Sequence, residues 1–140
     1  MKQDRSYILY ADDDPDDLEI IGDTVQRLTP LIDVVTRENG KKAFEFLELL
    51  TSGDRLPSLV VLDLNMPDWD GFKTLEELKK HPVYQKIPVV IFTNSDHPQH
   101  RSLSVSNGAA GFQTKPDSNQ ELKKICEWFA GYTSLPATFK

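Results

Sequence analysis

The chain has 140 residues, of which 39% are hydrophobic and 27% charged, as is ordinary for one soluble globular domain with a real core. The 16 Lys and Arg against 22 Asp and Glu give a formal net charge of −6. This balance argues against nucleic acid as the main partner, because phosphate binding relies on a basic surface. No segment approaches the roughly 20 apolar residues of a membrane span, and the acidic N-terminus does not resemble a signal peptide. The single cysteine, Cys126, excludes an internal disulfide. A cytoplasmic location is therefore the simplest expectation.

The first third of the chain predicts two strand–helix units. Residues 7–11 (YILYA) form a short apolar run that predicts a buried strand. The acidic stretch after it contains Pro15, which suits the first turn of a helix, and apolar residues then recur every three or four positions. A β-branched run at 32–36 predicts a second strand, and the apolar spacing over 43–50 predicts a second helix.

The stretch 59–71, LVVLDLNMPDWDG, contains the first candidate functional residue. Its apolar start, Leu59–Leu62, predicts a strand buried on both faces, as in a parallel sheet covered by helices. Asp63 ends that run, so its carboxylate is expected at the carboxyl end of the strand. Turn-forming residues follow, and a helical pattern begins at Phe72. Open α/β sheets bind ligands at the carboxyl ends of their strands.

The last third predicts two more strands and two more helices. Residues 88–92 (PVVIF) form a buried strand, whereas 97–107 are mostly polar and predict a helix with a weak apolar stripe. A brief strand at 112–114 precedes Lys115, and 118–129 have a clear apolar stripe. Strand and helix thus alternate five times, which predicts an α/β fold with a five-stranded parallel sheet and helices on both faces.

Side chains of the types that accept or bind a phosphoryl group follow several of these strands. If the strand order is 2-1-3-4-5, Asp12, Asp13 and Asp63 converge at the switch point of the sheet. Such a cluster needs a cation, and Mg²⁺ prefers oxygen ligands of this kind. Alternatively, the acidic run 12–17 is only the solvent-exposed start of a helix. Thr93 and Lys115 at adjacent strand ends favour a phosphoryl site instead, in which an Asp is the nucleophile.

Four motifs occur in a specific order: ADDD at 11–14, VLDLNMPDWDG at 61–71, IFTNS at 91–95 and TKP at 114–116. With them the chain resembles the receiver domains of two-component response regulators, including the chemotaxis regulator. The resemblance implies a flavodoxin-like sheet of order 2-1-3-4-5. We expect the receiver domain to cover residues 1–132 and residues 133–140 to be a C-terminal tail. More narrowly, the chain resembles the single-domain regulators paired with bacterial phytochrome kinases.

The resemblance assigns roles to the acidic residues. It implies that Asp63 is the phosphoacceptor, that Asp13 binds Mg²⁺ directly and that Asp12 acts through water. Asn65 would supply its backbone carbonyl to the metal. Lys115 would pair with Asp63 and then with the phosphoryl oxygens.

The remaining implied roles concern switching. Thr93 would turn to hydrogen-bond the phosphoryl group, and the aromatic side chain of Phe112 would follow inward. Asn65 and Ser95 lie two residues beyond key positions, where the family tunes dephosphorylation. The bond before Pro116 is expected to be cis.

These features predict a phosphorelay protein that takes a phosphoryl group from a sensor histidine kinase of the phytochrome or hybrid type. The surface of the fourth helix, fifth strand and fifth helix would then switch for a downstream protein that the sequence does not identify. No enzymatic activity is expected beyond self-catalysed phosphorylation and dephosphorylation. Two alternatives are a phosphorylation-independent adaptor and an aspartyl-phosphate phosphohydrolase. The phosphohydrolase would need a second acid two residues after Asp63, where Asn65 stands.

Nucleic acid and membrane are not expected as partners. Apolar residues in the last helix and the tail leave two readings open, a homodimer interface or folding back onto the monomer. These residues are Trp128, Phe129, Tyr132, Leu135 and Phe139.

Overall fold

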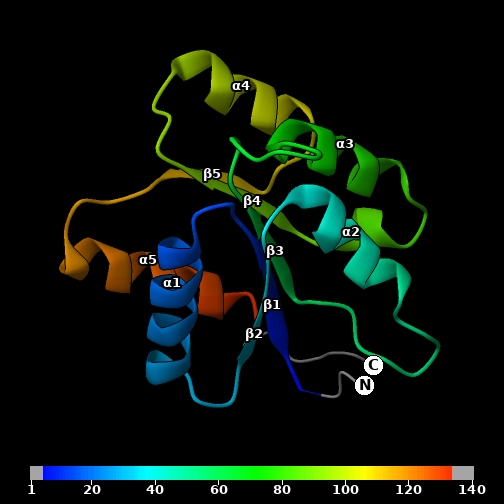
Figure 1. Ribbon diagram of the computed structural model, residues 1–140, viewed down its shortest axis with the longest axis horizontal. Coiled ribbons are helices and arrows are strands. Elements are labelled where there is room, and N and C mark those ends of the chain that lie inside the picture. Colours follow the sequence, from blue (N-terminus) through cyan, green and yellow to red (C-terminus); the bar gives the residue numbers. More distant parts are fainter. Residues whose placement is uncertain (1–4, 134–140) are drawn as a thin grey trace.

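A computed structural model describes residues 5–133, which form a five-stranded parallel sheet with helices on both faces (Figure 1). The strands are β1 (Tyr7–Ala11), β2 (Asp33–Arg37), β3 (Leu59–Leu62), β4 (Val89–Thr93) and β5 (Gly111–Thr114). The helices are α1 (Pro15–Leu28), α2 (Gly40–Glu48), α3 (Gly71–Lys80), the short 3₁₀ helix η1 (Tyr84–Lys86), α4 (Pro98–Ser106) and α5 (Asn119–Gly131). The sheet order is β2-β1-β3-β4-β5 and every pairing is parallel, so the predicted flavodoxin-like fold is confirmed.

Two hydrophobic cores flank the sheet because alternate residues of a strand point to opposite faces. On β1, Leu9 packs into the core covered by α2 and α3, whereas Ile8 packs into the core covered by α1 and α5. All residues of β1, β3 and β4 are buried, as their continuous apolar runs predict. Figure 1 shows α1 and α5 together on one side and α2 and α3 on the other.

The ends of the helices follow capping rules. The Asp14 side chain accepts a hydrogen bond from the Asp16 N–H, and Pro15 occupies the first turn of α1. At α5 the Ser118 hydroxyl accepts a hydrogen bond from the Glu121 N–H. These caps place the start of α1 immediately after the acidic residues that follow β1.

Helix α4 is only weakly attached to the rest of the protein. Ser104 is its one buried residue, and the large apolar side chains of Leu103 and Val105 are exposed. The weak apolar stripe expected from the sequence is therefore present. Such an element opens at a lower free energy than one with a large buried face.

No helix within residues 5–133 is both long and apolar enough to cross a bilayer. The proposed tail lies outside the described residues except for Thr133, and so do Leu135 and Phe139.

Candidate functional site

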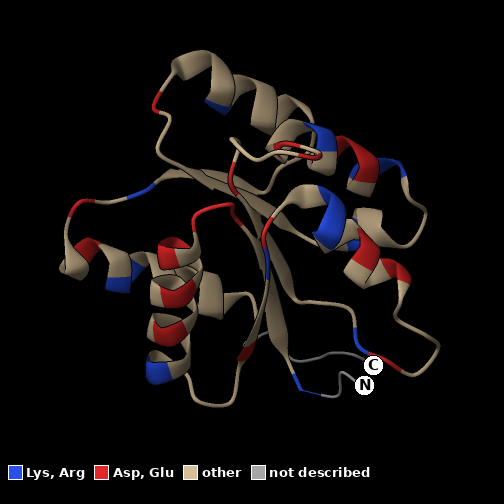
Figure 2. Cartoon of the chain, in the orientation of Figure 1, with Lys and Arg blue, Asp and Glu red and all other residues tan. Residues whose placement is uncertain are grey.

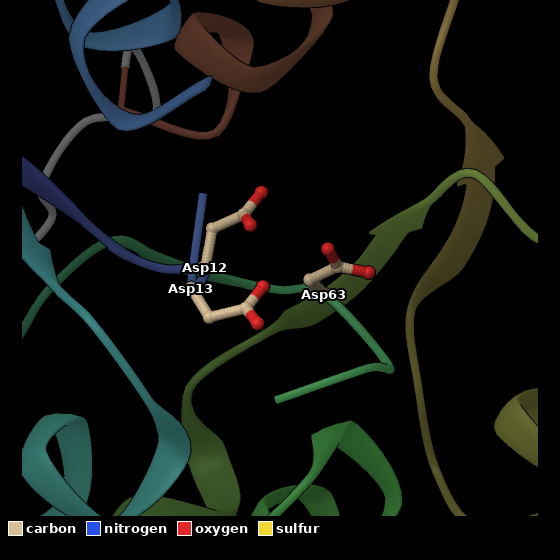
Figure 3. A group of neighbouring side chains, drawn as sticks. All are labelled: Asp12, Asp13 and Asp63. Carbon is tan, nitrogen blue, oxygen red and sulfur yellow. The ribbon is translucent and has the colours of Figure 1, made fainter. Parts of the chain in front are cut away.

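Three carboxylates meet where β1 and β3 end (Figure 3). Asp12 and Asp13 follow β1 directly, Asp63 follows β3, and these two strands are neighbours in the sheet. One oxygen of each carboxylate lies within 4.8 Å of the others. In Figure 2 the turn between β1 and α1 is correspondingly red. The structure therefore brings together the three acidic residues that the sequence predicts, and we call them the acidic site.

Lys115 neutralises part of this charge. It lies just after β5, and its Nζ is 2.6 Å from Asp12 Oδ2 and 3.0 Å from Asp63 Oδ2. A third carboxylate, that of Asp17 in the first turn of α1, lies 2.7 Å from the same nitrogen. Burial lowers the pKa of Lys115, but the hydrogen bonds to Asp12 and Asp17 and the charge of Asp63 raise it more. The net pKa lies above the ordinary value for lysine, so the ammonium stays charged.

Asp12 is fully buried and is held by three donors. Its Oδ2 accepts from the Tyr10 hydroxyl at 2.6 Å as well as from Lys115, and its Oδ1 accepts from the Asp14 N–H at 3.0 Å. Burial raises the pKa of Asp12, while the bonds from Lys115, Tyr10 and the Asp14 N–H lower it, and the net direction is upward. Burial and the neighbouring Asp12 charge raise the pKa of Tyr10, so its hydroxyl remains a donor.

Asp63 is fixed by its own loop. Its Oδ1 accepts from the Leu64 N–H at 2.7 Å, and only 6% of the residue is exposed. Gly71 at the start of α3 lies so close that a Cβ there would be 2.4 Å from the Asp63 carbonyl oxygen. The loop between them turns through Asp68 and Trp69, whose φ angles are +49° and +76°. Two successive left-handed residues without a glycine are uncommon.

Thr93 ends β4 and is fully buried. Its Oγ1 accepts from the Ser95 N–H at 3.4 Å, and the Ser95 hydroxyl lies 2.6 Å from Nδ1 of His100 in α4. On the neighbouring strand the Phe112 side chain is already buried. The guanidinium of Arg101 lies 5.0 Å from the centre of its ring. Of the predicted switch residues, Thr93 is thus linked to α4 through Ser95 and His100, and Phe112 through Arg101.

The predicted cis bond before Pro116 is wrong. Every peptide bond of the described residues is trans, including Lys115–Pro116. A trans X–Pro bond is favoured by about 0.5–1 kcal/mol in the absence of other constraints. Lys115 reaches all three of its carboxylate partners with the bond in this form.

Sequence reasoning missed two residues that touch the site, Tyr10 and Asp17. A signal for Tyr10 was present, because residues two apart on a strand share a face and Tyr10 precedes Asp12 by two. The only signal for Asp17 was its place as the third residue of a helix that starts beside the site. Its contact with Lys115 joins residues 98 apart in sequence.

Comparison with known proteins agrees with this geometry. The family described as the response regulator receiver domain matches residues 8–127, and the chain belongs to that family. The family predicted from the four motifs is thus confirmed.

Relatives of known name differ in how much of their length the chain covers. The probable methanogenesis regulatory protein FilR2 of Methanothrix harundinacea is 30% identical, over 96% of this chain and 90% of that protein. The sensor histidine kinase CheAY of Helicobacter pylori is 29% identical over 84% of this chain, which spans only 14% of that protein. The probable C4-dicarboxylate response regulator DctR of Bacillus subtilis is 26% identical, and the chain covers 52% of it.

Two of the matching solved structures show the shared fold. The phosphorylated cyanobacterial phytochrome response regulator RcpA superposes with a TM-score of 0.83 at 26% identity, covering 96% of this chain and 97% of that one. The Mn²⁺-bound response regulator Rcp1 gives a TM-score of 0.81 at 24% identity, over 94% and 97% of the two chains. The likeness to RcpA agrees with the narrower resemblance to phytochrome-associated regulators.

Proposed function

We propose that this protein accepts a phosphoryl group on Asp63 from a sensor histidine kinase, in the presence of Mg²⁺. The observation that carries the proposal is the environment of the Asp63 carboxylate. It lies beside two further carboxylates within 4.8 Å and is paired with Lys115 at 3.0 Å. A buried nucleophile with an acidic cluster on one side and a fixed cation on the other suits phosphoryl transfer better than a purely structural role.

The donor set fits a divalent cation. Asp13 is exposed, and no hydrogen bond among the described residues occupies its carboxylate, so it would bind the metal directly. Asp12 already accepts three hydrogen bonds and would act through water. Asp63 and the backbone carbonyl of Asn65 would complete the protein ligands. Bound Mg²⁺ would neutralise the charge that builds up on the phosphoryl oxygens.

The chain's own residues would carry out the transfer. An Asp63 carboxylate oxygen forms the new bond to phosphorus while the bond from phosphorus to the kinase histidine nitrogen breaks. Lys115 then donates to a phosphoryl oxygen instead of to Asp63, and the Thr93 hydroxyl supplies a second donor. The exposed Asn65 and the half-buried Ser95 would tune hydrolysis of the product.

Switching would spread from Thr93 to the α4-β5-α5 surface. Ser95 and His100 join the end of β4 to α4, and Arg101 joins α4 to the Phe112 ring. This surface has three exposed apolar side chains, Leu103, Val105 and Trp128. They would contact a downstream protein or a second copy of the chain.

The two alternatives have less support. An adaptor that ignores phosphorylation needs neither the acidic site nor its lysine. A phosphohydrolase needs a second acid and a substrate pocket beside the nucleophile, but Asn65 stands where the acid would be. An apolar cavity of about 690 Å³, lined by Leu28, Pro30 and Ile32, lies instead at the amino ends of β1 and β2.

The proposal is tested by intact-mass measurement after incubation with Mg²⁺ and acetyl phosphate. Wild type should gain the mass of one phosphoryl group, and Asp63→Asn should gain none. Asp68→Asn makes the same chemical change at an exposed position in the same loop and should still be phosphorylated. An adduct that persists in Asp63→Asn would remove this residue from the role, and no adduct on wild type would favour the adaptor.

A further inference from the structure

Lys115 has three carboxylate partners, and one of them is not part of the acidic site. An ammonium group has three N–H donors, and Asp12, Asp17 and Asp63 each lie within 3.0 Å of Nζ. The distance to Asp17, 2.7 Å, is shorter than the distance to Asp63. All three donors of the lysine are thus in use before any phosphoryl group arrives.

Asp17 differs from the other two partners in its access to water. Its side chain is 29% exposed, against 0% for Asp12 and 8% for Asp63. It also lines a cavity of about 170 Å³, together with Lys115 and Pro116, between α1 and the start of α5. Water can therefore solvate the Asp17 carboxylate when the lysine leaves it, whereas a fully buried carboxylate would be left without compensation.

We propose that Asp17 is a positioning residue of the phosphoryl site, which holds Lys115 and sets the balance between metal binding and phosphoryl binding. This inference rests on the proposed function. Its physical basis is the sign of the Asp17 charge. A carboxylate next to Lys115 attracts a divalent cation to the site but repels a phosphoryl group, and it also competes with that group for the ammonium.

The two effects predict changes of opposite sign in Asp17→Asn. The affinity of the unphosphorylated protein for Mg²⁺ should fall about three- to tenfold, because one negative charge near the cation is lost. The affinity for beryllofluoride, a phosphoryl mimic, should rise by a similar factor at saturating Mg²⁺, because Lys115 is released to the anion. Both affinities can be measured by titration calorimetry.

Asp16→Asn is the matched control. Asp16 lies in the same turn of α1 and carries the same charge, but it is exposed and makes no side-chain contact with Lys115. Both affinities should stay within about twofold of wild type. In Asp17→Glu, which keeps the carboxylate, both should move back towards the wild-type values.

Each outcome decides the inference. If both affinities fall in Asp17→Asn, the residue only supports the structure of the site, and if neither changes, the contact has no role. An equal effect in Asp16→Asn would assign the change to net charge. If wild type itself fails to bind beryllofluoride, the proposed function is overturned and this inference with it. If wild type binds and Asp17→Asn binds identically, only this inference fails.

Discussion

At the scale of single residues, Lys115 lies at the centre of the charged groups that follow the strands. Its side chain is 8% exposed, and its ammonium separates carboxylates that come from α1, from the end of β1 and from the end of β3. Without it, the buried carboxylates of Asp12 and Asp63 and the half-buried carboxylate of Asp17 would have no cation beside them among residues 5–133. Removing one partner of a buried ion pair is costly because the other charge remains buried.

Lys115→Met should therefore lower stability most in the absence of metal. In EDTA we expect the free energy of unfolding to fall by about 3 kcal/mol or more. Mg²⁺ should restore a larger part of the stability in this variant than it adds to wild type, because the cation replaces the lost charge. Urea unfolding with and without Mg²⁺ measures both effects. Lys124→Met, at an exposed position of α5, serves as the control, and an equal loss in EDTA and Mg²⁺ would contradict the explanation.

At the scale of elements, α2 holds the β3–α3 loop, which begins at Asp63. The Lys41 N–H donates to the Asp68 carbonyl at 3.1 Å, and the Phe44 ring lies 5.3 Å from the Trp69 ring. Gly40, the first residue of α2, packs so tightly that a Cβ would lie 1.8 Å from Thr74 Oγ1. Helix α2 and the β3–α3 loop therefore cannot move independently of each other.

Gly40→Ala should break this contact. We expect a loss of about 1–3 kcal/mol in the free energy of unfolding, because α2 must shift away from the loop. Gly22→Ala is the control, since a Cβ in the middle of α1 would meet only Val34 Cγ1 at 3.9 Å. That substitution should stabilise the protein by about 0.5–1 kcal/mol through helix propensity. Urea unfolding of the two variants should give changes of opposite sign, and a stabilising Gly40→Ala would refute the tight packing.

At the scale of the whole molecule, several buried groups make the folded state less stable at high pH. Burial raises the pKa of the Cys126 thiol from 9.0 to about 12. It also raises the pKa of Tyr7 and Tyr10, and the pKa of Lys115 is raised by its carboxylates. Each group binds its proton more tightly in the folded chain than in the unfolded chain. Stability is thus fully present below the unfolded pKa values and is lost as pH rises above about 9.

Cys126→Ala isolates one of these contributions. Between pH 9 and 10 the thiol alone should remove about 1 kcal/mol from the stability of wild type, since the unfolded chain ionises and the folded chain does not. The variant is expected to start with lower stability at pH 7, because it leaves a small cavity, but to lose less over this interval. Urea unfolding at pH 7, 9 and 10 provides the comparison. Parallel curves for the two proteins would show that the thiol ionises equally in both states.

The acidic site was predictable because it depends on strand order alone. Asp12, Asp13 and Asp63 each follow an apolar run, and the carboxyl ends of neighbouring parallel strands meet at one edge. The Asp17–Lys115 contact was not predictable, because it depends on how α1 packs beside the segment after β5. Helix η1 was missed for another reason, since three residues are too few to show a periodicity. The cis bond before Pro116 came from resemblance and had no support in the residues themselves.

The two tryptophans lie on different elements of the fold. The Trp69 indole is next to Phe44 and within 5.6 Å of the Lys73 ammonium, in the loop after Asp63. The Trp128 indole covers Gly111 on β5, where a Cβ would be 2.9 Å from its Cη2 atom. The protein therefore has one intrinsic fluorophore in the loop after Asp63 and another against β5. Trp128→Phe would leave emission that reports on the loop, and Trp69→Phe would leave emission that reports on β5 and α5, so the order of their movements could be timed without an added dye.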